Sequence, residues 1–178
     1  MKKLAIAAAL GALFVTNMAS ADDKVRARLM GFQEVPVVST EAGGTFEAVI
    51  NRNGDAIDFE ITYTGMQGTV TQSHMHVGQR SVNGGIVLWI CGTATNPAPA
   101  NSGNTNVCTS PDGHFTGTWR PENVQTLVNG QQIKTGELNE VIEAIRAGVA
   151  YVNVHSNLSA GGEIRGQVRA NHRDHDRD

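Results

Sequence analysis

Residues 44–64 carry the clearest pattern in the chain and read GTFEAVINRNGDAIDFEITYT. Apolar and polar residues alternate through Gly44–Asn51 and again through Ala56–Thr64, as they do in strands that bury only one face. The intervening Asn53-Gly54-Asp55 is a hairpin signal, because Asn-Gly accepts positive φ at both central positions of a tight turn. The sequence therefore predicts an antiparallel hairpin at this point.

Six more segments have the composition of short strands, and one segment has helical periodicity. The helix is predicted from apolar residues at i, i+3, i+4 and i+7, with Thr135 as its cap and Gly148 as its stop; these apolar residues are Leu138, Val141, Ile142 and Ile145. The strands are predicted at Lys24–Gly31, Thr69–Val77, Gly85–Cys91, His114–Arg120, Ala150–Ser156 and Glu163–Ala170. Many short strands with one short helix in a crossover indicate an all-β fold, an antiparallel Greek-key sandwich or barrel.

The N-terminus has the pattern of a secretory signal peptide. Lys2 and Lys3 precede the short apolar run Leu4–Val15, and Ala19-Ser20-Ala21 is a small-residue cleavage signal. We therefore expect residues 1–21 to be removed and residues 22–170 to form one domain. The apolar run is too short to span a bilayer, and no later stretch approaches the length of a membrane helix, so no membrane span is expected.

Charge and tail composition exclude some partners. The net charge is −3 with neutral histidine, and no basic stripe is visible, which argues against a nucleic-acid partner. The last eight residues, 171–178, contain no apolar side chain and are predicted to be a disordered, solvated tail. A weak metal-collecting role for His172 and His175 is the alternative for this tail.

Cys91 and Cys108 are the only cysteines of the chain. In an exported protein a single pair is expected to be bridged, and the bridge would close a loop rich in Asn, Ala, Pro, Thr and Gly. This loop has no core-forming pattern, so the predicted disulfide would restrain it. Long restrained loops often lie over functional sites.

Three histidines are the candidate site. His74 and His76 alternate along one predicted strand and so share one of its faces, while His155 stands on another strand. In Ala150–Ser156 the apolar positions alternate with Tyr151, Asn153 and His155, which places His155 on the face away from the core, toward the loops. Three neutral imidazoles with an open position are a common arrangement for Zn, Cu, Ni or Fe. The sequence therefore predicts a metal site, and the alternative is three outward-facing polar residues without an ion.

The expected ion is copper, with zinc next, because an all-imidazole set in an oxidising compartment suits both and copper binds more tightly. Glu34, Asn153 and Glu163 are candidates to orient the rings from behind. Glu163 and Arg165 lie two apart on a predicted strand, so they could hold an anion or pair with Glu34. The alternative for this pair is an ion pair that joins the first loop to the last strand.

The sequence has no signature of nucleophilic catalysis. It lacks a Gly-x-Ser-x-Gly elbow, a free cysteine and a phosphate-binding glycine loop. A metal-activated water remains as a possible catalytic group, but no feature of the sequence specifies a substrate. The sequence therefore favours a binding protein over an enzyme.

Four motifs in this order resemble the CHRD domain, which is named for chordin and is also found alone in exported bacterial proteins. They are Leu29-Met30-Gly31-Phe32-Gln33-Glu34-Val35-Pro36, Ser73-His74-Met75-His76-Val77-Gly78 with Val82-Asn83-Gly84-Gly85-Ile86-Val87, Gly148-Val149-Ala150-Tyr151-Val152-Asn153-Val154-His155-Ser156, and Gly161-Gly162-Glu163-Ile164-Arg165-Gly166-Gln167. The resemblance spans Lys24 to Arg169. It implies an immunoglobulin-like or barrel-like all-β domain, and it implies little about activity. The chain departs from the family at Val37, where a second proline is common, and in the long loop between its cysteines.

A second likeness is to the copper half of Cu/Zn superoxide dismutase, a small exported β-barrel with one disulfide. The matching positions are His74, His76, His155 and Arg165. No bridging histidine with a zinc cluster of His and Asp accompanies them. The signal peptide predicts a periplasmic or secreted protein, and the three-histidine set predicts that it handles copper or protects against redox damage. The alternative is a module without metal that interacts with another envelope or extracellular protein.

Overall fold

The structure is a computed structural model that describes residues 22–103, 106–127 and 130–170. The predicted signal peptide, residues 1–21, and the predicted tail, residues 171–178, lie outside the described residues. The described residues form short strands, one α-helix and three single turns of 3-10 helix. In chain order they are β1 (Asp23–Met30), η1 (Gly31–Gln33), β2 (Gly43–Ile50), β3 (Ile57–Thr64), β4 (Val70–Val77), β5 (Gly85–Cys91), η2 (Ala100–Ser102), β6 (Gly113–Trp119), η3 (Pro121–Asn123), α1 (Leu138–Arg146), β7 (Ala150–Ser156), β8 (Ile164–Gln167) and β9 (Arg169–Ala170).

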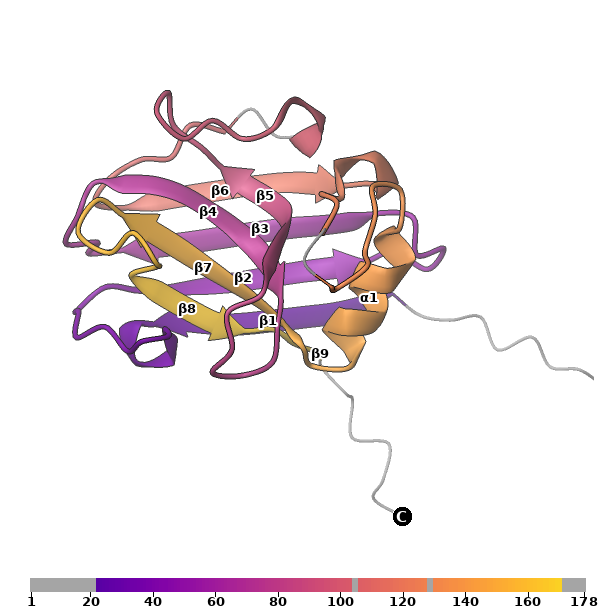
Figure 1. Cartoon of the computed structure of the whole chain (residues 1–178), viewed down its shortest axis with the longest axis horizontal. Helices are drawn as coiled ribbons and strands as arrows, with labels where there is room; N and C mark the ends of the chain where they lie inside the picture. The colour runs from indigo at the N-terminus through magenta and orange to yellow at the C-terminus, as the bar shows by residue number, and fades with distance from the viewer. Residues whose placement is uncertain (1–21, 104–105, 128–129, 171–178) are drawn as a thin grey trace, which may run out of the picture.

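The described strands form one antiparallel sheet that curls into a nearly closed barrel. Its order is β5-β4-β7-β8-β1-β2-β3-β6, and β9 pairs with β1 (Figure 1). The two edge strands, β5 and β6, approach each other, and the Trp119 indole Nε1 donates a hydrogen bond of 2.8 Å to the Trp89 carbonyl across this seam. The all-β antiparallel fold predicted from the sequence is confirmed, and every predicted strand is present, although the segment predicted as one strand at Glu163–Ala170 is divided into β8 and β9.

The predicted β2–β3 hairpin forms, with Ile50 opposite Ile57. Its turn is wider than the predicted two-residue turn, since only Gly54 has positive φ, at +70°, and Asn53 does not. The Asn51 side chain explains the difference: its Oδ1 accepts hydrogen bonds from the backbone N–H groups of Asp55 and Ala56. The Asn51 side chain closes a longer loop, in which Asn53 and Gly54 form only part of the turn.

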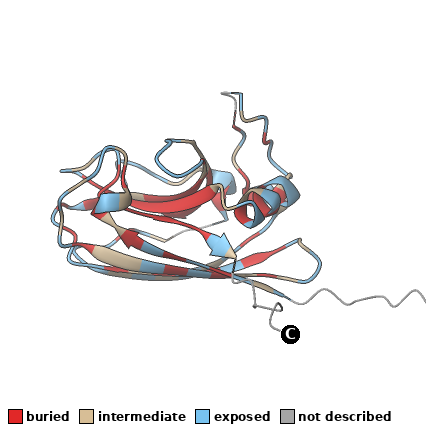
Figure 2. Cartoon of the chain, turned by 90° about the horizontal axis from the view of Figure 1, so that it is seen from below, coloured by how far each residue is buried: buried red, intermediate tan, exposed pale blue. Residues whose placement is uncertain are grey.

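The hydrophobic core lies between the two halves of the sheet (Figure 2). In β3 every second residue is buried and the others face solvent, which is the pattern of a strand covered on one side. Trp119 is the largest fully buried side chain of the described residues, and its ring stacks on Phe59 at 4.0 Å between centroids and lies 6.0 Å from Phe46. β7 differs from β3, because all seven of its residues are buried, so both of its faces are covered.

Helix α1 lies at one end of the barrel and belongs to the crossover from β6 to β7 (Figure 1). Its four apolar positions are buried, as the periodicity predicts. The predicted cap is wrong: Glu137 occupies the N-cap, with no side-chain hydrogen bond, and Thr135 lies outside the helix. The predicted stop is confirmed, since Gly148 has φ +71° and its N–H donates to Ile145, the arrangement that glycine favours after a helix.

The Cys91–Cys108 disulfide is present, as predicted. Cys91 is the last residue of β5, so the bridge ties the end of this strand to the far end of the following loop. Backbone hydrogen bonds between Gly92 and both Asn106 and Cys108 add to the closure. The bridged loop lies beside β5, away from the loops that cover β7 (Figure 1).

Candidate metal centre

The three predicted histidines are brought together by the pairing of β4 with β7. In the antiparallel register His74 lies opposite Asn153 and His76 lies opposite Tyr151, while His155 lies opposite Gln72. Residues opposite each other share a face, so all three imidazoles stand on the side of the sheet away from the core. The centroid of the His74 ring lies 4.6 Å from that of His76 and 4.7 Å from that of His155.

One ligand atom from each ring lies within 4.8 Å of the other two. Nitrogens bound to one ion at the usual distance of 2.0–2.1 Å are at most about 4.2 Å apart. A small inward movement of the rings is therefore enough for all three to reach a common ion. The strand parity predicted from the sequence is what sets this geometry.

The site is almost completely buried, which the sequence did not indicate. His74 is 0% exposed, His155 6% and His76 7%. Loops cover this face of β7, and two of them contribute backbone carbonyls from Gly84 and Ala160 that contact the rings (Figure 1). The outward face of β4 and β7 is thus a second interior, lined by polar side chains.

Hydrogen bonds to these loops fix which ring nitrogens are free. The Nδ1 atoms of His76 and His155 lie 2.8 Å from the carbonyl oxygens of Gly84 and Ala160, respectively. A carbonyl only accepts, so Nδ1 carries the proton on both neutral rings and Nε2 keeps its lone pair. A ring that donates from one nitrogen to a carbonyl and offers the other is the usual arrangement of a metal-binding histidine.

Buried nitrogens without a partner converge at this point. Both ring nitrogens of His74 and Nε2 of His155 are buried and have no hydrogen-bond partner. The Nε2 of His76 faces Oδ1 of Asn153 at 3.2 Å, so two acceptors meet there. Each unsatisfied buried group costs about 1–3 kcal/mol. A cation bound by the three lone pairs would remove much of this cost.

All three rings are held neutral near pH 7. Burial, followed by the neighbouring charges of His76 and His155, lowers the pKa of His74 well below its ordinary value. Burial also lowers the pKa of His76 to about 4, and it lowers the pKa of His155. Because only the neutral imidazole binds a metal, protons do not compete for these nitrogens at neutral pH.

Aromatic side chains enclose the cluster, and sequence reasoning did not assign them to it. Tyr151 stacks on His76 with 4.5 Å between centroids and 4° between planes, and Trp89 meets His74 edge-on at 5.0 Å. The Arg165 guanidinium lies 3.4 Å from the centre of the Tyr151 ring. Tyr151 therefore contacts both His76 and Arg165, and the positive charge of Arg165 is the last of the causes that lower the pKa of His76. Tyr151 and His155 lie on the same face of β7, and this alternation in the sequence could have placed Tyr151 beside the cluster.

The candidate orienting residues divide into two groups. Asn153 contacts His76, as described, and Glu34 lies beside the same amide, since Glu34 Oε1 and Asn153 Nδ2 both flank Gly162. Burial raises the pKa of Glu34, and its Oε1 has no hydrogen-bond partner. Glu163 does not touch a ring. The chain of Glu34, Asn153 and His76 is therefore the polar support behind the site.

Glu163 and Arg165, which the sequence offered as an anion site or as partners of Glu34, are held mainly by hydrogen bonds to loops. Within the described residues neither forms an ion pair. Arg165 donates to the carbonyls of Gln79 and Val82, each at 3.0 Å. Carboxylate Oε1 of Glu163 accepts from the Gln67 N–H at 2.8 Å and from the Thr40 hydroxyl at 3.0 Å. Burial alone would raise the pKa of Glu163, but these and other hydrogen bonds lower it. Both residues brace loops, through hydrogen bonds rather than charge pairs.

Replacement of Gly162 by alanine is expected to lower the free energy of unfolding by about 2 kcal/mol. Gly162 has φ +124°, and a Cβ at this position would overlap the Glu34 carboxylate. Gly161→Ala is the matched control, since a Cβ there meets no atom within 4 Å, and a change below about 0.5 kcal/mol is expected. Urea unfolding of both variants measures the difference, and equal stability would contradict the crowding of Glu34 at this turn.

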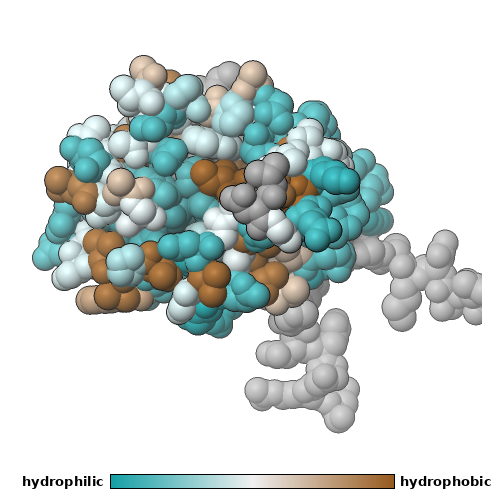
Figure 3. Space-filling model, in the orientation of Figure 1, coloured by the Kyte–Doolittle hydropathy of each residue, from teal (hydrophilic) through white to brown (hydrophobic). Residues whose placement is uncertain are grey.

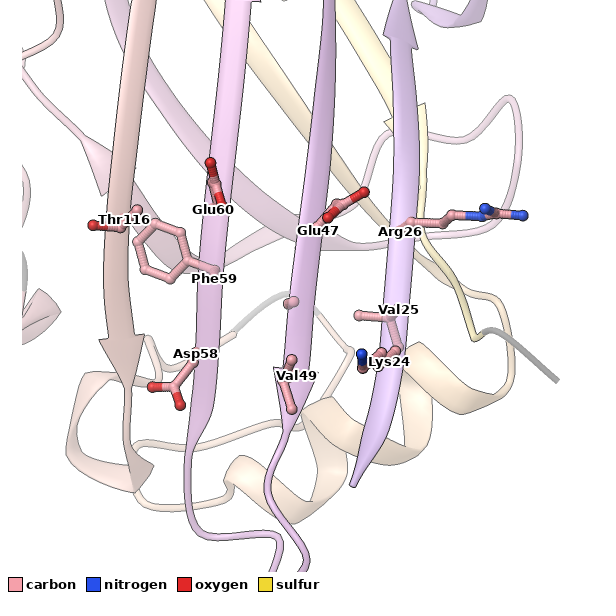
Figure 4. A pocket seen from close by; sticks show the side chains of 10 residues that line it. Lys24, Val25, Arg26, Glu47, Val49, Asp58, Phe59, Glu60 and Thr116 are labelled. Carbon is pink, nitrogen blue, oxygen red and sulfur yellow. The ribbon is translucent and has the colours of Figure 1, made fainter. Parts of the chain in front are cut away.

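Other histidines and grooves of the described residues lie elsewhere. His114 is exposed on β6, where its Nε2 contacts Glu60 Oε1 at 2.8 Å. A shallow groove on the outer face of β1, β2, β3 and β6 is lined by side chains of mixed charge, among them Glu47, Asp58 and Arg26 (Figure 4). No histidine faces it, and it lies across the barrel from the cluster.

Comparison with known proteins identifies a family. A family model described as CHRD domain matches residues 25–168, in agreement with the four motifs of the sequence. Searches of curated proteins and of solved structures found no match. Among the residues that the structure describes, no helix has the length and apolar character needed to cross a membrane.

Proposed function

This chain belongs to the CHRD-domain family, and we propose that it binds one transition-metal ion through His74, His76 and His155. The observation that carries the proposal is the convergence of buried imidazole nitrogens that have no other partner. Two carbonyls accept from Nδ1 of His76 and of His155, so that Nε2 of each ring keeps its lone pair for an ion. Buried nitrogens without a partner destabilise the metal-free protein, and a bound ion would remove this cost.

Copper is the proposed ion, with zinc second. Imidazole suits both, and a site of given ligands binds Cu²⁺ more tightly than Zn²⁺. The two cysteines are bridged, so no thiolate is available to favour zinc or Cu(I). A bound copper ion would supply one-electron redox chemistry. The near-complete burial of the rings favours retention of the ion over turnover of a substrate, so we propose metal handling or redox protection.

The proposed location is the periplasm or the extracellular space. The Cys91–Cys108 disulfide fits an oxidising compartment. The signal pattern predicted for residues 1–21 agrees with export. In such a compartment copper is not buffered by cytosolic thiols, so a protein site built from imidazoles can hold it.

The mature protein is expected to retain one equivalent of copper and to bind Cu(II) at least about 10-fold more tightly than Zn(II). Elemental analysis after gel filtration and competitive calorimetric titration measure these two quantities. The control is a His172→Ala/His175→Ala variant, which removes the tail histidines and is expected to retain the full equivalent. Less than a tenth of an equivalent of either metal in the wild type would end the proposal.

An interaction module without metal is the second candidate. Loops on the side of the site carry exposed apolar side chains: Phe32, Val37, Val82 and Leu158 are 48–70% exposed. Figure 3 shows apolar residues, in brown, over this part of the surface. If these residues bind a protein partner and the histidines only brace the scaffold, copper would leave the melting temperature unchanged, whereas a retained ion raises it.

A further inference from the structure

A second polar feature lies at the seam where β1 meets β8 and β9, outside the metal site. A groove of about 690 Å³ is lined there by four arginines from three segments, Arg26 and Arg28 of β1, Arg169 of β9 and Arg80 of the β4–β5 loop. Arg26 and Arg28 are two residues apart on β1, whereas Arg80 and Arg169 are distant from them in the sequence. Only the fold brings them to one groove.

The positive charge of this groove is not neutralised by the protein. The chain carries a net charge of −3, yet Glu47 is the only carboxylate among the lining residues. Although Glu47 lies opposite Arg26 in the register, Figure 4 shows the Arg26 side chain extending away from it. Within the described residues none of the four guanidinium groups forms a hydrogen bond or an ion pair with the protein.

The register places like charges directly opposite each other. Arg26 pairs with Arg169 across β1 and β9, and Arg28 follows on the same face as Arg26. Like charges opposite each other in an antiparallel pair are destabilising. An anion would offset the repulsion among these groups.

The backbone that carries the arginines is held in place by two glutamines. Gln33 donates from Nε2 to the Arg28 carbonyl at 2.8 Å, and its Oε1 accepts the Gln167 N–H at 3.4 Å. Gln167 in turn donates from Nε2 to the carbonyls of Gly78 and Gly148, each at 3.0 Å. These bonds tie β1, β8 and the loop that carries Arg80 together. The groove is therefore organised before a ligand arrives.

We propose that this groove binds a ligand with two or more phosphoryl groups. The planar guanidinium matches phosphate oxygens with paired hydrogen bonds, and phosphoryl groups in tandem can meet several guanidinium groups at once. A single carboxylate would leave most of the charge unpaired. The same chemistry is offered by a soluble polyphosphate and by a lipid headgroup that carries phosphates. The site is independent of the metal centre.

The test compares tripolyphosphate binding to the metal-free wild type, to R26Q/R169Q and to a control, R52Q/R120Q. The control removes the same charge from exposed arginines outside the groove. Calorimetric titration in 0.15 M salt is expected to show binding at least 10-fold weaker for R26Q/R169Q and less than 2-fold weaker for the control. Without ligand, R26Q/R169Q is expected to melt no lower than the wild type, because the opposed charges are gone.

Flotation with vesicles that contain a bisphosphorylated lipid separates the two sources. Co-flotation of the wild type and the control, with loss in R26Q/R169Q, supports a headgroup; tripolyphosphate binding without co-flotation supports a soluble ligand. Failure of the wild type to bind either probe overturns the proposal. Equal binding by the wild type and R26Q/R169Q, or equal weakening by the control, also overturns it.

Discussion

Exchange of His74 for leucine is expected to weaken copper binding at least about 100-fold, because one of the three proposed ligands is lost. The same exchange is expected to raise the free energy of unfolding of the metal-free protein by about 1 kcal/mol. Both nitrogens of His74 are buried without a partner, and an apolar side chain of similar volume carries no such cost. Copper titration and urea unfolding in the presence of a chelator measure the two effects.

His114→Leu is the matched control for this exchange. His114 is exposed and lies outside the cluster, so its replacement is expected to leave copper affinity unchanged within 2-fold. A His74→Leu protein that binds copper like the wild type would contradict the three-histidine site. A metal-free His74→Leu protein less stable than the wild type by several kcal/mol would instead show that His74 serves the packing around Trp89.

A His74→Leu protein that binds copper more weakly but is more stable without metal would distinguish a functional site from a structural one. A sequence selected only for stability would place apolar residues at a position that is 0% exposed. Natural proteins retain destabilising residues at positions where a binding site requires them. The unpartnered buried nitrogens are therefore informative, because we expect the metal-free protein to be less stable for having them.

The fold was predictable because its pattern is local. Alternation along β2 and β3 marks both strands, and the four apolar positions of α1 mark the helix. The predictions of the β2–β3 turn and of the helix cap were wrong, because side-chain contacts override local backbone preferences there. Asn51 closes a longer turn than Asn53-Gly54 alone would make, and Glu137 rather than Thr135 stands at the start of the helix. Such choices depend on contacts that only the folded chain provides.

The geometry of the site was predictable in part. Strand parity predicts that His74 and His76 share one face, and the pairing of β4 with β7 in the structure brings His155 beside them. The burial of that face was not predictable, because the loops that cover it have no periodic pattern and their carbonyls are invisible in a sequence. The arginine groove was missed for a related reason. Arg26 and Arg169 are neighbours only through the pairing of β1 with β9.

The metal-free protein is expected to lose stability as the pH falls from about 7 to 4. The unfolded chain binds protons on its histidines near pH 6.5, whereas burial lowers the pKa of His76 to about 4 in the folded state. The folded state therefore binds fewer protons in this window, and His76 alone removes about 3 kcal/mol of stability by pH 4. His74 and His155 act in the same direction, since their pKa values are also lowered.

The number of titrating rings can be measured from the slope. Each ring contributes up to about 1.4 kcal/mol per pH unit where the unfolded form is protonated and the folded form is not. Glu34 opposes this trend, because burial raises its pKa and the folded state then gains a proton first, so the comparison is made in a Glu34→Gln background. In that background urea unfolding between pH 5 and pH 6 is expected to show a slope that His74→Leu reduces by one ring's contribution and His114→Leu does not. A free energy of unfolding that stays flat from pH 7 to pH 5 would mean that the three rings accept protons in place, and the site would then be open to water rather than closed around an ion.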